Sequence, residues 1–526
     1  MATDAVSSAP ATPPRPAPFE QTPAASLTQR ASLNVAASLL DYAAKVAVGF
    51  LVVPVLVSGL GRSLYGVWEM LGRLVGYMSA GDGRPTQALR LVVANLQASP
   101  DDRAKRRYVG ASLVVWLLFL PLTVLLGGAL IWFAPAITKV APTLHPAVRA
   151  TCALLVVALL FANLASLPES VLRGMNLGYK RMGLQALLEV VGGALTAGAV
   201  YVGLGVAGAA GSQIAFYALL GLCFWFVSKK YVRWFGVERP TRAEVRELLG
   251  LSLWYSAGEA ITKLLLASDA VILGIVVSPA AVTSYVLTGY ATRLAVNVHV
   301  LAAGGAIPGI GGVIGEQQYD KATRLRRELL ALTWLFVTVV GSTILLWNHS
   351  LLGLWVGPEN YAGTRINLLI VLIMAQTAFI RSDAFVIDAA LRPRLRVAVT
   401  AAAAALTIGL STLLTMRFGM VGVCTGVLAG RLTQSIAYPR LVRTCLGPPS
   451  AATRGWMLRP LLVMSLLFAA AAFLGDRVVA THWIVWAGGV VATLVVVLPA
   501  ALATGLPPDL RAVVLTRLRE ARRRFP

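Results

Sequence analysis

The sequence is dominated by apolar runs of about 20 residues that follow one another with only short polar loops between them. A chain inside a bilayer must satisfy its backbone hydrogen bonds internally, and apolar runs of this length do so as α-helices. The 526 residues are 57% hydrophobic and only 13% charged. Beyond the N-terminal tail, no polar stretch is long enough to hold a soluble domain. We therefore predict an all-α, polytopic membrane protein.

The apolar runs number about fourteen and form two sets of six, followed by a final pair. They lie near 33-57, 64-98, 109-134, 147-167, 182-203 and 207-228, then near 250-277, 281-306, 328-347, 366-390, 397-416 and 420-439, and finally near 460-475 and 482-503. The run 64-98 is interrupted by Asp82-Gly83-Arg84-Pro85, which predicts a broken or partly amphipathic helix that lines a cavity or packs on protein.

The runs divide the chain into six regions. These are a disordered cytoplasmic tail (1-32), an N-terminal six-helix bundle (33-228), a cytoplasmic basic linker (229-249), a C-terminal six-helix bundle (250-440), two additional transmembrane helices (441-505) and a basic cytoplasmic tail (506-526). Two matching six-helix repeats are typical of transporters whose halves rock around a central site.

Lysine and arginine are distributed unevenly between alternate loops. Most of them lie in the two tails and in every second loop, whereas the other loops hold only Arg62, Lys139, Arg149, Arg365, Arg417 and Arg477. The positive-inside rule therefore places both termini in the cytoplasm. The same distribution accounts for the net charge of +23 through topology and contacts with anionic membrane lipids. We predict no nucleic-acid binding, because no folded recognition module accompanies the basic loops.

Two apolar runs each carry an acid and a lysine four residues apart. Asp41 and Lys45 lie in the first run, and Glu259 and Lys263 lie at matching places in the seventh. Residues four apart share one helix face, so each acid is predicted to meet its own lysine. A charge at the bilayer centre costs about 3 kcal/mol on insertion scales, so such residues usually face a bundle interior or a wet cavity. The pairs either contact the substrate or only neutralise each other.

A third pair with the same spacing, Glu69 and Arg73, lies in the second run. Asp269 is different, because no basic residue lies three or four positions away from it. A lone buried acid is suited to coupling transport to a proton or sodium gradient. The alternative is a hydrogen bond from Asp269 to a neighbouring helix. Arg381, Asp383 and Asp388 in the run 366-390 either pair locally or approach the cytoplasmic end.

The junctions between the last two helices of each repeat are also alike. Gly205 and Gly208 join the fifth and sixth helices, and Gly419 and Gly422 join the eleventh and twelfth. Glycine at these positions predicts a tight turn and close helix packing.

The scattered cysteines and histidines have no metal-site or triad spacing, so we predict no metal, no cofactor and no catalytic residue.

Short motifs in this order resemble the polysaccharide-transporter (Wzx-type) family of the multidrug/oligosaccharidyl-lipid/polysaccharide flippase superfamily. The motifs are Leu60-Gly61-Arg62-Ser63-Leu64-Tyr65-Gly66, Ala88-Leu89-Arg90 with Val93-Ala94, Asp269 with Gly274 and Tyr285, Leu354-Trp355-Val356-Gly357, and the Gly419 to Gly422 junction. The resemblance covers roughly residues 33-500. It implies two six-helix bundles in a V around a central cavity, which helices 1, 2, 7 and 8 line.

The resemblance further implies a flippase that moves undecaprenyl-diphosphate-linked oligosaccharides across the bacterial plasma (inner) membrane for capsule, exopolysaccharide or O-antigen export. A polysaccharide polymerase and a chain-length regulator would be partners in such a pathway. Arg84, Arg90 and Arg293 lie on the cavity helices and would bind the diphosphate together with Lys45, Arg73 and Lys263. Alternatively, Arg84 and Arg90 sit at the cytoplasmic headgroup level.

Two other functions fit the sequence less well. A multidrug exporter of the same superfamily would have an acid-rich, aromatic cavity for organic cations, whereas this chain mixes acids with several cations. A membrane-embedded glycan ligase or polymerase would need a sizeable extracytoplasmic segment, and the longest one predicted here is only near Asn348 to Arg365.

Overall fold

The computed structural model describes residues 24–305, 307–391, 393–447 and 456–524, and every regular element in these ranges is a helix. The predicted all-α, polytopic fold is confirmed. The α-helices are α1 (Ala24–Met78), α2 (Pro85–Asn95), α3 (Asp102–Thr138), α4 (His145–Gly174), α5 (Met182–Tyr201), α6 (Gly205–Tyr231), α7 (Arg242–Val276), α8 (Pro279–Thr288), α9 (Tyr290–Gly304), α10 (Ile307–Gly315), α11 (Tyr319–Trp355), α12 (Thr364–Ala389), α13 (Pro393–Leu446), α14 (Leu458–Gly475), α15 (Trp483–Thr504) and α16 (Pro508–Arg524). Three short 3-10 helices connect them: η1 (Pro142–Leu144), η2 (Gly178–Arg181) and η3 (Pro358–Asn360).

Eleven helical segments within the described ranges are long and apolar enough to cross a membrane. Two of these segments, Ser38–Met78 and Leu395–Leu446, contain a kink and are long enough for two crossings. Counting both halves of each kinked segment, and adding the 35-residue helix α7, gives about fourteen spans, as predicted.

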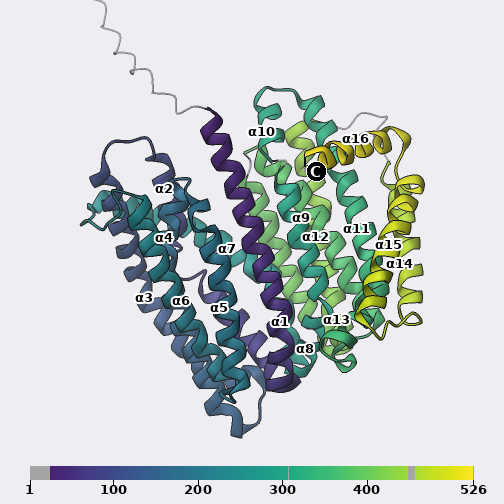
Figure 1. The fold of residues 1–526 in the computed structure, drawn as a ribbon, viewed down its shortest axis with the longest axis horizontal. Coiled ribbons are helices and arrows are strands. Elements are labelled where there is room, and N and C mark those ends of the chain that lie inside the picture. Colours follow the sequence, from purple (N-terminus) through teal and green to yellow (C-terminus); the bar gives the residue numbers. More distant parts are fainter. Residues whose placement is uncertain (1–23, 306, 392, 448–455, 525–526) are drawn as a thin grey trace, which may run out of the picture.

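The helices form two groups that lean apart toward one end (Figure 1). The first group contains α1 to α6, and the second contains α8 to α16. We call the end where α2, α10 and α16 lie the open end, and the end where α8 lies the closed end. Helix α7 packs on both groups. Leu248 in its first half contacts the cluster of α2 and α3, whereas Leu265 in its second half packs on Ala403 and Ala404 of α13.

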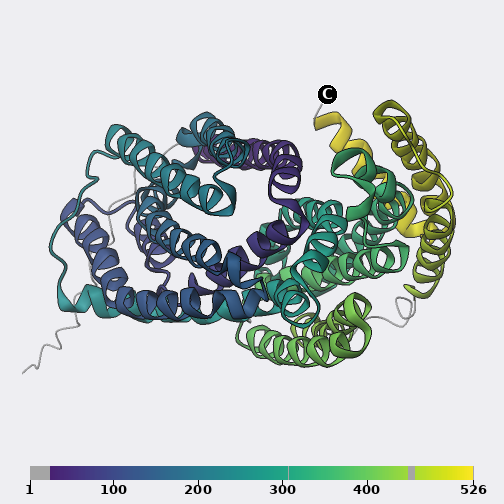
Figure 2. The ribbon, with the colours of Figure 1, turned by 90° about the horizontal axis from the view of Figure 1, so that it is seen from below.

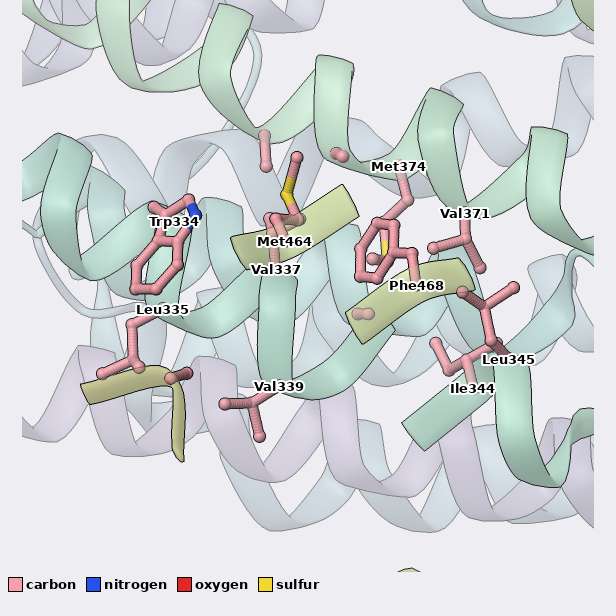
Figure 3. Close-up of a cluster of buried hydrophobic side chains, with 14 of the residues drawn as sticks. Trp334, Leu335, Val337, Val339, Ile344, Leu345, Val371, Met374, Met464 and Phe468 are labelled. Atoms are coloured by element: carbon pink, nitrogen blue, oxygen red, sulfur yellow. The ribbon is translucent and has the colours of Figure 1, made fainter. Parts of the chain in front are cut away.

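Helices α14 and α15 lie at the outer edge of the second group, away from the first group (Figure 2). Both pack on α11. Phe468 and Met464 of α14 are buried against α11 and α12 beside Val371 and Met374, in a cluster that also contains the fully buried Trp334 (Figure 3). A core of this size stabilises the second group through close packing, because lipid supplies little hydrophobic driving force between helices. The two predicted additional helices therefore extend the second bundle.

Glycines mark the sharp turns at the ends of paired helices. Gly61 and Gly419 have φ of 72° and 55° inside α1 and α13, and Gly205 has φ of 61° at the start of α6. Only glycine adopts such angles without strain. A Cβ on Gly422 would lie 2.1 Å from the Leu414 carbonyl oxygen, so this glycine also permits close packing. The predicted turns at the Gly205 and Gly419 junctions are confirmed.

Two predicted boundaries are wrong. Helix α1 begins at Ala24, inside the range predicted as a disordered tail, because residues 24–32 are good helix formers that extend the first span. Residues 1–23 lie outside the described residues. The single helix predicted near 281-306 is two helices, α8 and α9, which meet at Gly289. The basic C-terminal segment contains the helix α16.

The predicted break in the second span is confirmed. Helix α1 ends at Met78, and α2 begins at Pro85. Gly83 and Arg84 have φ of 79° and 46°, in the left-handed region, and the Asp82 carboxylate accepts a hydrogen bond from the Arg84 N–H at 2.9 Å. This local bond satisfies a backbone donor that the interrupted helix leaves free. The break consequently places Arg84 at the start of α2 with its side chain free to turn toward α7.

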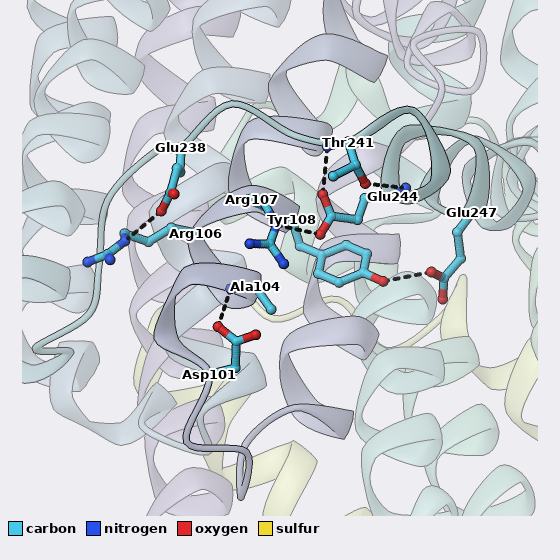
Figure 4. Close-up of polar contacts among 9 residues, drawn as sticks. All are labelled: Asp101, Ala104, Arg106, Arg107, Tyr108, Glu238, Thr241, Glu244 and Glu247. Atoms are coloured by element: carbon cyan, nitrogen blue, oxygen red, sulfur yellow. Dashed lines mark hydrogen bonds and ion pairs between the residues drawn. The ribbon is translucent and has the colours of Figure 1, made fainter.

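The linker between α6 and α7 is fastened to the start of α3 (Figure 4). Glu238 accepts a bond from Arg106 at 3.3 Å, Glu244 from Arg107 at 2.7 Å, and Glu247 from the Tyr108 hydroxyl at 2.6 Å. Thr241 and Glu244 also form a capping box at the start of α7. These contacts hold the first turns of α7 against the first group.

A similar cap starts α3 itself. The N–H of Ala104 donates to the Asp101 carboxylate at 2.8 Å (Figure 4), which holds the pKa of Asp101 below its usual value. The cap satisfies one of the free N–H groups of the first turn.

We predict that Gly66→Ala destabilises the protein, because a Cβ there would lie 1.8 Å from the Pro279 carbonyl oxygen of α8. Overpacking of this kind costs about 1–3 kcal/mol or more. Gly72→Ala in the same helix is the matched control, because nothing lies within 4 Å of its Cβ. The midpoint of thermal unfolding of purified protein should fall for Gly66→Ala and stay level or rise slightly for Gly72→Ala. Equal midpoints would contradict the close contact between α1 and α8.

Candidate functional site

A buried ion pair joins α1 to α7. The Arg73 guanidinium lies 3.2 Å from the Asp269 carboxylate, and the side chains are only 17% and 18% exposed. The Tyr285 hydroxyl of α8 donates to the other carboxylate oxygen at 2.7 Å. Asp269 is therefore not the lone acid that the sequence predicted, because its cation comes from a residue 196 positions earlier. The alternative prediction, a hydrogen bond to a neighbouring helix, is confirmed.

A second set of charges lies where the broken span meets α7. The Arg84 guanidinium contacts the Glu259 carboxylate at 2.6 Å, and Lys263 lies 3.7 Å from the same carboxylate. The Lys263 ammonium also donates to the Gly76 carbonyl at 2.7 Å and to the Ser79 hydroxyl. The predicted pairing of Glu259 with Lys263 is confirmed, but the contact with Arg84 is closer. Both contacts are only partly buried, so the site has access to polar surroundings.

The predicted pairing of Asp41 with Lys45 is wrong. Arg181 lies 3.9 Å from the Asp41 carboxylate, and the Lys45 ammonium lies 3.3 Å from Glu189 of α5. The spacing of four residues permits a contact on one helix face, but α5 and the segment before it bring a partner for each residue. Asp41 is buried at 8% exposure, whereas the Lys45 side chain is 53% exposed. The cluster continues to Glu169, which lies 3.2 Å from Arg181.

The predicted pairing of Glu69 with Arg73 is also wrong, because Arg73 turns to Asp269 and Glu69 accepts a bond from the Tyr65 hydroxyl at 3.2 Å. Arg293 of α9 donates to the Val286 carbonyl at 2.8 Å. Arg90 is exposed on α2. Within the described residues, neither Arg90 nor Arg293 has a carboxylate within 4.0 Å.

Three residues of the site were missed from the sequence: Arg181, Glu169 and Glu189. They lie at or inside the ends of apolar runs, which is the same signal that identified Asp41. Arg181 and Glu189 have no oppositely charged residue three or four positions away, and their partners come from other elements. Glu169 contacts Arg173, four positions later on the same helix, at 2.6 Å as well as Arg181. Helix spacing alone does not reveal the contacts between elements.

The two groups of helices also contact each other directly at the closed end. The Arg62 guanidinium donates to Ser284 at 2.7 Å, and Thr283 donates to the Arg62 carbonyl at 2.6 Å. The Trp355 ring stacks on Phe50 at 5.0 Å and its N–H donates to the Phe50 carbonyl at 2.7 Å. No group of three His, Cys, Asp or Glu side chains suited to a metal ion is found among the described residues.

We predict that Asp269→Asn lowers stability strongly, because it leaves the buried Arg73 charge without its acid. Breaking such a pair costs roughly 3–5 kcal/mol. The double variant Arg73→Gln/Asp269→Asn should lose less stability than the sum of the losses in Arg73→Gln and Asp269→Asn. Glu238→Gln is the control, because its ion pair with Arg106 is about a third exposed on each side and is worth about 0–1 kcal/mol. The midpoint of thermal unfolding measures the stability of each purified variant: Asp269→Asn, Arg73→Gln, the double variant and Glu238→Gln. Similar losses for Asp269→Asn and Glu238→Gln would contradict the central role of this pair.

The fold is similar to those of solved membrane transporters. The lipid II flippase MurJ in an inward closed conformation aligns with a TM-score of 0.65 and 12% identity, over 88% of this chain and 97% of that one. An inward-facing multidrug resistance MATE family transporter of the MOP superfamily aligns with a TM-score of 0.60 and 14% identity, over 77% and 97%. An outward-facing multidrug resistance MATE family transporter aligns with a TM-score of 0.51 and 14% identity, over 79% of this chain and 95% of that one. No protein-family model and no curated protein matches the sequence. The chain therefore has the polytopic fold of these transporters and this flippase.

Proposed function

We propose that this chain is a flippase that moves undecaprenyl-diphosphate-linked oligosaccharides across the bacterial plasma membrane by alternating access, for export of a polysaccharide. The membrane part has the fold of solved transporters and of a lipid II flippase, which supports the proposal. The positive-inside pattern makes the open end cytoplasmic. The two ends of the described chain, the start of α1 and α16, lie together at this open end (Figure 1).

The observation that carries the proposal is the set of charges between α7 and the first group. Arg84, Lys263 and Arg73 each contact α7 or the broken span through bonds that the rocking of one group against the other would break. A diphosphate offers oxygens that can replace Glu259 at Arg84 and Lys263, since guanidinium and ammonium groups bind phosphate well. Substrate binding would in this way compensate for the ion pairs lost on opening.

The balance of charge favours an anionic substrate over an organic cation. The carboxylates of Asp41, Glu259 and Asp269 each already contact a basic side chain. Arg90 and Arg293 have no carboxylate within 4.0 Å in the described part of the chain. Glu69 and Asp82 also have no basic side chain within 4.0 Å in the described residues, and their carboxylates accept hydrogen bonds from the Tyr65 hydroxyl and the Arg84 N–H. A multidrug exporter for organic cations would need such acids to be free, and both already have a donor. We therefore rank the multidrug exporter second.

The lysine side chains provide the test. We expect Lys263→Ala to slow flipping about tenfold or more, because a hydrogen bond to a charged group contributes about 1.5–3 kcal/mol. Lys45→Ala should have a smaller effect, because Lys45 is half exposed. Purified protein in liposomes that contain a fluorescent undecaprenyl-diphosphate oligosaccharide reports the rate at which the label changes leaflet.

Lys321→Ala, on an exposed turn of α11, is the matched control and should flip at the wild-type rate. In cells, Lys263→Ala should reduce polymer export at an unchanged protein level. Transport of organic cations by the wild-type protein, without movement of the lipid-linked sugar, would reverse the ranking of the two functions. Full flipping by Lys263→Ala would overturn the role given to Lys263.

A further inference from the structure

A separate cavity of about 300 Å³ lies inside the second group, between α7, α12 and α13. Its polar lining includes Arg381, Arg396, Arg431, Glu259, Gln434 and Tyr438. This volume is at the small end of the range for ligand pockets. The cavity is thus sized for a head-group fragment rather than for a whole oligosaccharide.

Arg431 is buried in this wall at 6% exposure and has no acid beside it. It donates to the Thr377 hydroxyl at 2.8 Å and to the Leu265 carbonyl at 3.2 Å, while its Nε has no hydrogen-bond partner among the described residues. Asp269 is the carboxylate whose charge acts on it, but that carboxylate already contacts Arg73. A buried charge without a counter-ion is costly, so some other group is expected to balance it.

Arg381 lines the same cavity from α12 and also lacks a carboxylate within 4.0 Å in the described ranges. The two acids that follow it on α12 are engaged elsewhere, since Asp383 contacts Arg326 at 2.8 Å and Asp388 contacts Arg396 at 2.9 Å. Glu259 reaches the cavity from α7, but its carboxylate is held by Arg84 on the other side. Two guanidinium groups in the cavity wall therefore remain unbalanced.

We propose that this cavity binds a phosphate-type oxyanion, held by Arg431 and Arg381. Planar guanidinium groups bind phosphate oxygens through two parallel N–H bonds. Gln434, whose side-chain N–H donates to the Tyr438 hydroxyl at 3.1 Å, orients neutral polar groups on the same wall. The anion is either a free phosphate compound or the diphosphate of a lipid carrier, and the second identity rests on the proposed function.

Because Glu259 lines this cavity and also holds Arg84, the site adjoins the charges that link α7 to the first group. An anion next to Glu259 repels its carboxylate toward Arg84, which lies on the other side. The cavity and the contact with Arg84 therefore share one acid, and substrate in the cavity acts on that acid.

The test measures anion binding by full-length protein in nanodiscs of neutral phosphatidylcholine. Inorganic pyrophosphate is one probe, and undecaprenyl diphosphate added to the disc is the other. We expect saturable thermal stabilisation by at least one probe, and a loss of affinity of at least tenfold in Arg431→Gln and in Arg381→Gln. The affinity of Arg431→Lys for the probe should lie between that of the two glutamine variants and that of the wild type. Arg417→Gln is the matched control, because Arg417 is exposed on the same helix.

Stabilisation by the lipid probe alone identifies a lipid diphosphate as the ligand, and stabilisation by pyrophosphate as well identifies the oxyanion itself as sufficient. No response to either probe, or an unchanged response in both glutamine variants, overturns the site. Arg381→Gln keeps the test valid if Arg431→Gln does not fold. Anion binding through these arginines without flipping would support the site and contradict the proposed function. Flipping without such binding would support the proposed function and contradict the site.

Discussion

The cost of placing charge inside a bilayer is the constraint on which this structure depends. Arg73 and Asp269 lie within apolar helices and are both more than four-fifths buried. Each would be expensive alone, so the pair forms only if α1 and α7 stay together. Tyr285 supplies a further hydrogen bond from α8. This polar cluster thus fixes the relative position of α1, α7 and α8. Apolar residues alone would allow these helices to slide along one another, because lipid supplies little driving force for one packing arrangement over another.

Helix α7 connects the two groups, because its first half packs on the first group and its second half packs on the second group. Its first turns are fastened to α3 by the contacts of Glu244 and Glu247 with Arg107 and Tyr108, and Glu238 in the preceding linker contacts Arg106. Its second half is packed on α13. Movement of one group relative to the other must therefore bend α7 or break the contacts at Glu259 and Lys263. The charged residues in the middle of α7 lie at the point where such a movement would act.

Two kinds of charged residue can be distinguished in the membrane part. Asp41, Glu259 and Asp269 are compensated by cations of other elements, and the contacts of Glu259 and Asp269 hold α7 against the first group. Arg431 and Arg381 are not compensated by any described carboxylate within 4.0 Å, and they face a cavity. Uncompensated buried charge is a common mark of a binding site, because function and not stability maintains it.

The sequence by itself determined the all-α polytopic fold, the two sets of six helices, the final pair and the broken second span. These features follow from the length of apolar runs and from local residue chemistry, such as Gly83 and Pro85 at the break and glycine at the Gly205 and Gly419 turns. Local rules act over a few residues and can be read directly from the chain. The site residues Arg84, Glu259 and Lys263 were also identified from the sequence, because a charge in an apolar run is conspicuous.

Only the tertiary structure decided which charges meet. Spacing predicted that Asp41 meets Lys45 and that Glu69 meets Arg73, but Arg181, Glu189 and Asp269 are the partners instead. Spacing of four residues shows that two side chains can touch, whereas packing decides which of several opposite charges is nearest. Arg431 was not singled out, although it lies in an apolar run in the same way as Arg293. Its lack of a carboxylate within 4.0 Å among the described residues is a property of three packed helices, and no local pattern contains that information.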